Sequence, residues 1–478
     1  MRVGGGLERC SARVWFRGAV FVLTLALVAG AAQSESGAVE RLSEAIRFRT
    51  LSTQNAEDFD PAPFLAFHEF LEHSYPRTHE LLGREVVADY SLLYTWQGSD
   101  GSLDPILLTS HIDTVPVIPG SLERWTQPPF SGAIADGFVW GRGTLDNKYG
   151  VIATLEAVEA LVAEGFTPTR TVYLAFGHDE EIGGNEGAEG ITQLLESRDI
   201  RLWFSLDEGM AILDGIAGLE GRLAAIGVAE KGFVSLELVA SAPGGHSSMP
   251  SRDSAIGKLA AAIGRVEANP MPVRLDGMSG EMLDAIAQRT GGFNGFALRN
   301  RWLFGPLVTS ELSKRPETNA MMRTTTAVTM VRGGVKENVL PSKASAIVNF
   351  RLHPDDTIEG LVKHIREVVA DPEVLVSVVR GSEASEVSSS SGDAWDALTA
   401  AIQVVYPGTP ATPALVLGGT DSKHYARVAG DAYRFSPMVL GADDAKRVHG
   451  INERISVEVY EKMPRFYGAL IRGAAGPR

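Results

Sequence analysis

Short acidic and histidine motifs recur along this chain, several of them where an apolar segment ends. They lie far apart in the sequence, so only a fold that gathers them lets them act together. Because carboxylates and imidazoles are costly to gather unless a cation neutralises them, the pattern predicts a metal site shared by distant segments. The candidate residues are Ser110, His111, Asp113, Asp146, Glu180, Glu181, Asp207, Gly245, His246 and His449.

The length and charge of the chain narrow the class of protein. A chain of 478 residues is long for one hydrophobic core and predicts two domains. Its 44% hydrophobic and 22% charged content is that of a globular protein rather than a disordered or fibrous one. Acidic residues exceed basic ones by 15, and this balance predicts no nucleic-acid partner, because the phosphate backbone is bound by basic clusters.

The first 32 residues have the pattern of a secretory signal peptide. Four arginines precede an apolar run at residues 19–29, and small residues follow it. The run is short for a transmembrane helix, so an uncleaved N-terminal anchor is the alternative interpretation. We expect an exported protein, in the periplasm, the secretory lumen or the medium. Cys10 is the one cysteine of the sequence, so cleavage would leave a mature chain without disulfides.

Strands and helices alternate in two parts of the chain, residues 39–229 and 382–478. This alternation predicts an α/β domain with a mostly parallel sheet covered by helices on both faces. Strands are expected at residues 105–109, 171–176, 202–206 and 414–418, and helices at 147–163, 395–405 and 457–472.

Residues 230–381 have a different pattern and predict a second domain inserted into the first. Strands are expected at 233–240, 324–331, 344–352 and 374–379, with helices at 254–267 and 357–369. The order β-α-β-β-α-β is that of a ferredoxin-like split βαβ fold. A long insertion at residues 270–318 should contain loops mixed with short helices.

Each motif alone has a simpler interpretation beside the functional one. His111 and Asp113 are two residues apart after a strand, so the carboxylate could orient a metal-binding imidazole, or the two could form an ordinary loop hydrogen bond. Asp146 could bridge two cations or cap a helix. Of Glu180 and Glu181, one could bind metal while the other accepts a proton from water, or both could lie in a solvated turn.

Other candidate ligands and substrate contacts are spread over both domains. Asp207 follows a strand, and His449 lies near the C-terminus; ligands of open α/β sheets gather at strand ends. His246 and Arg351 lie in the inserted domain, where a turn histidine and a surface ion pair are the alternatives. Asn338 and the turn of Gly418, Gly419 and Thr420 complete the set, because backbone N–H groups of such a turn can bind a carboxylate.

Together these segments resemble the two-zinc aminoacylase and carboxypeptidase family of metallopeptidases. The motifs are S-H-I-D-T-V-P at 110–116, G-R-G-T-L-D-N-K at 141–148, D-E-E-I-G-G at 179–184, G-G-H-S-S-M-P at 244–250, and His449. The similarity covers residues 39–468. The motifs L-D-E-G at 206–209, N-A-M-M-R-T at 319–324 and G-G-T-D at 418–421 resemble the branch of carboxypeptidase S and the N-fatty-acyl-amino-acid synthase/hydrolases.

The resemblance implies a zinc-exopeptidase-like α/β domain with an inserted lid or dimerisation domain, and two divalent metal ions, most simply Zn²⁺. It implies that Asp146 bridges the two ions. Some relatives use a glutamate at the position of Glu208, so the choice between Asp207 and Glu208 stays open. The implied ligands are His111 and Asp207 for one ion, and Glu181 and His449 for the other.

The resemblance also implies roles in catalysis. Asp113 would orient His111, and Glu180 would be the general base. His246 would stabilise the oxyanion, and in dimeric relatives it comes from the partner subunit; Arg351 and Asn338 would contact substrate. The expected activity is release of an amino acid from an N-acyl amino acid or a peptide C-terminus, in a possible homodimer formed through the inserted domain. A dipeptidase and a non-catalytic metal-binding protein are the alternatives.

Overall fold

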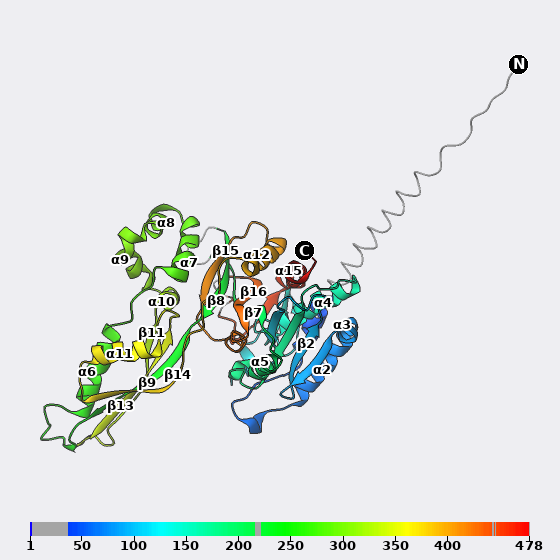
Figure 1. The fold of residues 1–478 in the computed structure, drawn as a ribbon. Helices are drawn as coiled ribbons and strands as arrows, with labels where there is room; N and C mark the ends of the chain where they lie inside the picture. Colours follow the sequence, from blue (N-terminus) through cyan, green and yellow to red (C-terminus); the bar gives the residue numbers. More distant parts are fainter. Residues whose placement is uncertain (2–36, 216–220, 442–443, 445, 478) are drawn as a thin grey trace.

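Figure 1 shows the computed structural model of the chain. It describes residue 1 and residues 37–215, 221–441, 444 and 446–477. The predicted signal segment, with Cys10, falls in residues 2–36 and so lies outside the described residues, and export stays a prediction. Within the described ranges, no helix has the length and apolar character needed to cross a membrane.

A large mixed sheet forms the centre of the first domain. Among the described residues it has eight strands in the order β1-β2-β6-β3-β7-β16-β8-β15. The central pairs β6–β3, β3–β7 and β7–β16 are parallel, as is β15–β8, in agreement with the predicted mostly parallel sheet. The strands are β1 (Gly83–Val87), β2 (Ser91–Trp96), β3 (Ile106–His111), β6 (Val172–Gly177), β7 (Leu202–Asp214), β8 (Arg222–Glu230), β15 (Ala411–Val416) and β16 (Ala429–Leu440).

Helices cover both faces of this sheet and bury its apolar side chains. One face packs on α2 (Ala62–Ser74), α4 (Lys148–Ala163), α12 (Asp393–Val405) and α15 (Met463–Ala475) in the largest hydrophobic core, and the short helix α3 (Pro76–Leu81) follows α2. The other face packs on α5 (Gly187–Ser197) and α13 (Ser422–Tyr425). The closing helix predicted at 457–472 is in fact two, α14 (Val457–Tyr460) and α15, because Pro464 lacks an N–H and suits the first turn of a new helix.

Strand β7 is longer than its sequence pattern suggests. We expected it to end at Leu206, but it continues to Asp214 and pairs with both β16 and β8. Its pairing with β16 is irregular between Asp207 and Met210, and Gly209 has a φ of 134°. Asp207 and Glu208 therefore lie inside a strand at a bulge and not after a strand end.

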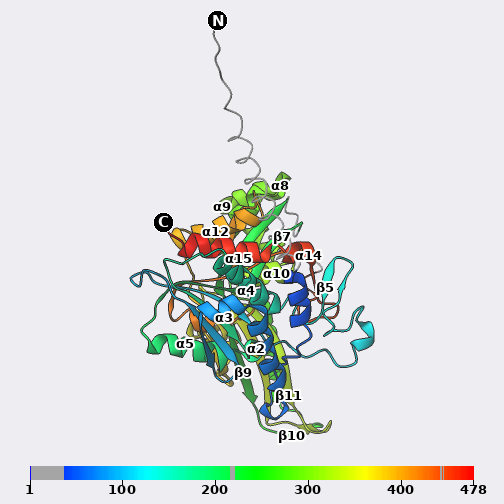
Figure 2. The same ribbon diagram turned by 90° about the vertical axis from the view of Figure 1, so that its right-hand side faces the viewer.

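The inserted segment forms a separate four-stranded antiparallel sheet with two helices on one face. Its strand order β11-β13-β9-β14 is that of the predicted ferredoxin-like split βαβ fold, and its own core runs from Val234 to Val376. The tip of the domain carries the short pair β10 (Gly245–His246) and β12 (Val339–Leu340), far from α15 in Figure 2. The elements are β9 (Gly232–Ser241), α6 (Ala255–Ala268), β11 (Thr325–Gly333), β13 (Lys343–Leu352), α11 (Ile358–Val369) and β14 (Val374–Ser382).

The long insertion within this domain is helical. It contains α7 (Gly277–Gln288), α8 (Gly292–Arg299), α9 (Arg301–Leu312) and α10 (Pro316–Met322). Met282 and Leu283 of α7 pack on Ala225 of β8 and Ala414 of β15, so the insertion rests on the edge of the large sheet. Figure 1 shows α8 and α9 at the outer end of this helical group.

A small sheet joins the C-terminal part of the chain to the loop before α4. Strand β17 (Arg454–Ser456) pairs with β5 (Phe138–Trp140), which pairs with β4 (Ile134–Ala135). The pairing of Arg454 with Trp140 brings the turn that contains His449 beside the loop that contains Asp146. Short 3₁₀ helices lie at η1 (Ala56–Asp58), η2 (Leu122–Arg124) and η3 (Glu180–Ile182).

Candidate metal centre

His111 ends strand β3 and is held in place by Asp113. Its side chain is 1% exposed, and its Nδ1 lies 3.2 Å from Oδ1 of Asp113 and 3.1 Å from the Asp113 carbonyl oxygen. With Nδ1 directed at these acceptors, Nε2 is left to face the other candidate ligands. The carboxylate of Asp113 also accepts the backbone N–H groups of Glu180 and Glu181, at 3.3 and 3.1 Å, so it fixes two parts of the site at once.

Asp146 lies between two histidines from opposite ends of the chain. Its Oδ1 is 2.9 Å from Nε2 of His111, and its Oδ2 is 2.9 Å from Nε2 of His449. The loop before it turns sharply at Gly141 and Gly143, which have φ angles of 146° and 96° that favour glycine. The alternative role as a helix cap is not found, because α4 begins without a side-chain cap.

Glu208, and not Asp207, faces His111. Oε1 of Glu208 lies 3.0 Å from Nε2 of His111. Oδ1 of Asp207 accepts the backbone N–H of Glu208 at 2.8 Å, and its Oδ2 is buried without a hydrogen-bond partner among the described residues. The two residues lie at the bulge of β7, and of their carboxylates only that of Glu208 contacts His111. The structure thus does not place Asp207 beside His111, with which it was expected to bind one metal ion.

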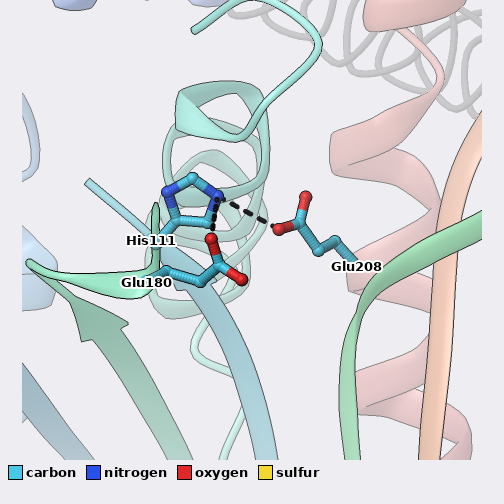
Figure 3. Close-up of side chains that lie close together, drawn as sticks. All are labelled: His111, Glu180 and Glu208. Atoms are coloured by element: carbon cyan, nitrogen blue, oxygen red, sulfur yellow. Dashed lines mark ion pairs between the residues drawn. The ribbon is translucent and has the colours of Figure 1, made fainter. Parts of the chain in front are cut away.

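Glu180 and Glu181 approach the cluster from the turn η3 after strand β6. Figure 3 shows the carboxylates of Glu180 and Glu208 both directed at the ring of His111, and Oε2 of Glu180 lies 3.9 Å from Nε2. Glu181 turns to the other histidine: its Oε2 lies 3.0 Å from Nε2 of His449, and its Oε1 accepts the N–H of Val115 at 3.2 Å. Adjacent acids therefore occupy different positions, as the sequence predicts.

The buried acids and histidines shift one another's protonation. Burial raises the pKa of Glu208 to about 8 and that of Glu180 well above its usual range, and neighbouring negative charges add to both effects. Hydrogen bonds to Asp146 and Glu181 raise the pKa of His449 to about 10. Burial opposes the charge of Asp146, but hydrogen bonds from His111 and His449 outweigh it and lower its pKa.

This donor set fits divalent metal ions. The groups His111, Glu180 and Glu208, and His111, Asp146 and Glu181, each place their candidate ligand atoms within 4.8 Å of one another. Two ligand atoms on one tetrahedral zinc ion are separated by about 3.3 Å, given bonds of about 2.0 Å. The separations of 2.9 and 3.0 Å around Asp146, Glu208 and Glu181 are close to this value. Imidazole and carboxylate ligands suit zinc, and also manganese or cobalt.

A buried ion pair that we did not single out from the sequence supports the centre. Arg142 and Glu453 are fully buried and bonded through Nη1 and Oε2. Nη2 of Arg142 donates to the carbonyl of Gly450, beside His449, at 3.1 Å. Oε1 of Glu453 accepts the N–H groups of Gly143 and Leu145 at 3.0 and 2.8 Å. The pair therefore holds the turn that contains His449 against the loop that contains Asp146. The burial of both charges has no local signal in the sequence and is seen only in the folded structure.

The structure does not bring His246 and Asn338 to this cluster within one chain. Both lie at the tip of the inserted domain, where Ser247 N–H donates to the carbonyl of Asn338 at 3.1 Å. His246 is exposed, and its Nδ1 lies 2.7 Å from the Ser248 hydroxyl. Arg351 is exposed near the end of β13, opposite Phe233 and so beside the connection between the domains.

The turn after β15 differs from its predicted role at one residue. Gly418 and Gly419 are exposed, and open space surrounds the position of each missing side chain. The N–H and hydroxyl of Thr420 instead both donate to Oε1 of Glu230, at 3.0 and 2.5 Å. Thr420 is therefore committed to the end of β8, where the chain leaves for the inserted domain, and its N–H is not free for a substrate carboxylate.

Comparison with known proteins identifies the family to which this chain belongs. Residues 107–473 match the model of peptidase family M20/M25/M40. The chain is 40% identical over 439 residues to a probable carboxypeptidase S-like 2 of Dictyostelium discoideum, covering 91% of this chain and 84% of the relative. It is 41% identical over 415 residues to an N-fatty-acyl-amino acid synthase/hydrolase of Danio rerio, covering 85% and 80%. An M20 family metallo-carboxypeptidase of Sulfolobus solfataricus has a similar fold, with a TM-score of 0.61 and 19% identity over 91% of this chain and 98% of that one.

Proposed function

Because this chain belongs to peptidase family M20/M25/M40 and is a metallopeptidase- or aminoacylase-type hydrolase of amide bonds, we propose that it releases an amino acid from an N-acyl amino acid or a peptide C-terminus. The observation that carries this proposal is the sharing of the Asp146 carboxylate by His111 and His449, with an acid beside each histidine. The similarity to a carboxypeptidase S-like protein and to an N-fatty-acyl-amino acid synthase/hydrolase supports a substrate that has a free carboxylate next to the cleaved amide.

We assign the metal ligands in two groups that share Asp146. His111 and Glu208 would hold one divalent ion, and Glu181 and His449 would hold the second, both most simply Zn²⁺. This replaces Asp207 with Glu208, in line with the 3.0 Å separation of Glu208 from His111. When bound, such ions polarise an amide carbonyl and lower the pKa of water.

Glu180 is the general base in this proposal. Its Oε2 lies 3.9 Å from Nε2 of His111, farther than the contacts of 2.9 and 3.0 Å that Asp146 and Glu208 make with that atom, so Glu180 borders the ligand cluster without being one of its closest members. Oε2 accepts the proton of the attacking water and passes it to the nitrogen of the leaving amine. Burial and neighbouring negative charges raise its pKa, so the protonated intermediate form is not strongly disfavoured.

The inserted domain supplies the groups that recognise the substrate. His246 is too far along the inserted domain to serve its own chain's cluster in this arrangement, so we propose that a second copy supplies it to stabilise the oxyanion. Arg351 binds the free carboxylate through its two-pronged guanidinium, with Asn338 as a further contact. The exposed N–H groups of Gly418 and Gly419 complete the carboxylate site; Thr420 does not take part.

The test is a panel of N-acyl amino acids, with short and long acyl groups, and of dipeptides, assayed with added zinc and after chelation. Release of amino acid from the N-acyl compounds that stops on chelation and returns with zinc supports the proposal. Cleavage of dipeptides alone would replace it with a dipeptidase. Zinc binding without turnover of any member would favour the non-catalytic alternative.

A further inference from the structure

The two successive helices α8 and α9 expose several large apolar side chains. The exposed fractions are 58% for Phe293, 49% for Phe296, 83% for Trp302, 58% for Leu303 and 42% for Leu307. We call these five residues the α8–α9 patch. Singly exposed apolar residues are ordinary, but adjacent ones on two successive helices mark an interaction surface.

The patch belongs to an ordered part of the fold. The rings of Phe293 and Phe296 each lie 5.7 Å from that of Phe304, centroid to centroid, in edge-to-face arrangements. On the opposite side, Ala297 and Val308 are buried, and Leu298 and Leu312 pack on the cluster that joins α7 to the large sheet. The two helices therefore already bury one side, and the exposed aromatic side is a second apolar surface.

The charge around the patch is opposite in sign to that of the whole chain. Residues 285–315 contain five basic residues, Arg289, Arg299, Arg301, Lys314 and Arg315, and one acid, Glu311, in a chain of net charge −15. Arg301 is paired with Asp284, and Lys314 is paired with Glu311. Arg299 and Arg315 are exposed, so basic groups accompany the aromatic side chains in this helical segment.

We propose that the α8–α9 patch docks on the surface of an anionic lipid membrane. Helices that lie at a lipid–water interface combine Trp, Phe and Leu on one side with Lys or Arg on the other. Interfacial aromatic rings suit the headgroup region, and basic side chains are attracted by anionic lipids. A second copy of this chain would bring a net negative charge and the same basic patch, whereas an anionic bilayer complements both the apolar and the basic groups.

This inference is independent of the proposed catalysis, because none of the five residues belongs to the metal centre. The test is co-sedimentation with vesicles of phosphatidylcholine alone and of an equimolar mixture with phosphatidylglycerol. The chain from residue 37 onward is used, because its described residues form the hydrophobic cores and the apolar run at 19–29 is then absent. Binding to the mixed vesicles that weakens at high salt is expected.

Two variants and one control separate the apolar and basic contributions. Phe293→Ser with Trp302→Ser should weaken binding at least about tenfold, which corresponds to about 1.4 kcal/mol. Arg299→Gln with Arg315→Gln should remove the preference for phosphatidylglycerol. Leu65→Ser with Leu81→Ser, which changes residues 49% and 56% exposed in the first domain, should bind as the unchanged chain does.

Three results would overturn the proposal. The first is no binding of the unchanged chain to either vesicle, and the second is unchanged binding of the Phe293 and Trp302 variant. The third is a fall in the solution mass of that variant from dimer to monomer, which would make the patch a contact between copies. Hydrolysis of a soluble substrate should be the same in all variants, and this checks that they fold.

Discussion

Oε1 of Glu208 lies 3.0 Å from Nε2 of His111, although Glu208 comes directly after Asp207, the acid that a family pattern would equally permit. Asp207 contacts the backbone N–H of Glu208 and has a buried oxygen without a partner among the described residues. The bulge of β7 at these residues sets which of two consecutive carboxylates reaches the site.

Replacing Glu208 by Gln should therefore remove a metal ligand, whereas replacing Asp207 by Asn should not. In the proposed two-metal centre, we expect Glu208→Gln to bind one of the two zinc ions at least about tenfold more weakly, since a neutral amide is a poor zinc ligand. Asp207→Asn, its matched control one residue away, should retain both. Zinc content after dialysis measures this; zinc loss by Asp207→Asn alone would return the assignment to Asp207.

Zinc binding should release protons and strengthen as the pH rises. In the metal-free chain the pKa of Glu208 is about 8 and that of His449 about 10, so both hold a proton at neutral pH. Zinc requires the carboxylate and the neutral imidazole, so protons compete with the metal. Between about pH 6 and pH 8 we expect the affinity to rise at least about tenfold per pH unit. Calorimetry in buffers of different ionisation enthalpy counts the protons that zinc releases. A zinc affinity that does not change with pH would contradict the protonation of Glu208 and His449 in the metal-free chain.

The Arg142–Glu453 pair should matter for stability more than any exposed pair. Glu453→Gln leaves a buried guanidinium without its counter-charge and is expected to destabilise the chain by about 3–5 kcal/mol. The double variant Arg142→Met with Glu453→Met should recover part of this loss. Urea denaturation measures the effect. Glu458→Gln, which breaks the exposed pair with Lys462, is the control and should leave the midpoint unchanged.

If a second copy supplies His246, two inactive variants should complement each other. His246→Ala should lower kcat by about a hundredfold or more, the usual effect of losing an oxyanion donor. When this variant is mixed with Glu180→Gln and the subunits exchange, each mixed dimer has one site in which both Glu180 and His246 are intact. Equal amounts should recover about one quarter of the parent activity, because half the dimers are mixed and each has one complete site. No recovery by an exchanging mixture would place His246 in its own chain's site.

Much of this fold could be predicted from the sequence, because local pattern and tertiary structure agree. The helix at Lys148–Ala163 and strands β9, β11 and β13 of the inserted domain follow from apolar periodicity, within a residue or two of the observed limits, whereas β14 continues three residues beyond its expected end. Strand β7 was underestimated because an acid pair and Gly209 interrupt its apolar run, and only pairing with β8 and β16 shows that it continues.

The sequence could predict those parts of the candidate site in which the residue type itself indicates the chemistry. It could not predict the parts that depend on how distant segments pack. His111, Asp146 and His449 could be named because imidazole and carboxylate groups near strand ends suggest metal binding. The preference for Glu208 over its neighbour depends on a bulge, and the commitment of Thr420 depends on Glu230, which is 190 residues away. Distant contacts of this kind are set by the whole fold and have no local signal.

The central claim is that a metal-dependent amide hydrolase uses Glu180 as its base, and one paired measurement tests it most directly. Zinc content and hydrolysis of an N-acyl amino acid are measured together for the parent chain, Glu180→Gln, and Glu186→Gln, an exposed acid of the same segment. The account predicts equal zinc in all three, a loss of kcat of about a hundredfold or more for Glu180→Gln, and parent activity for Glu186→Gln. Retained activity in Glu180→Gln with zinc bound would contradict the account.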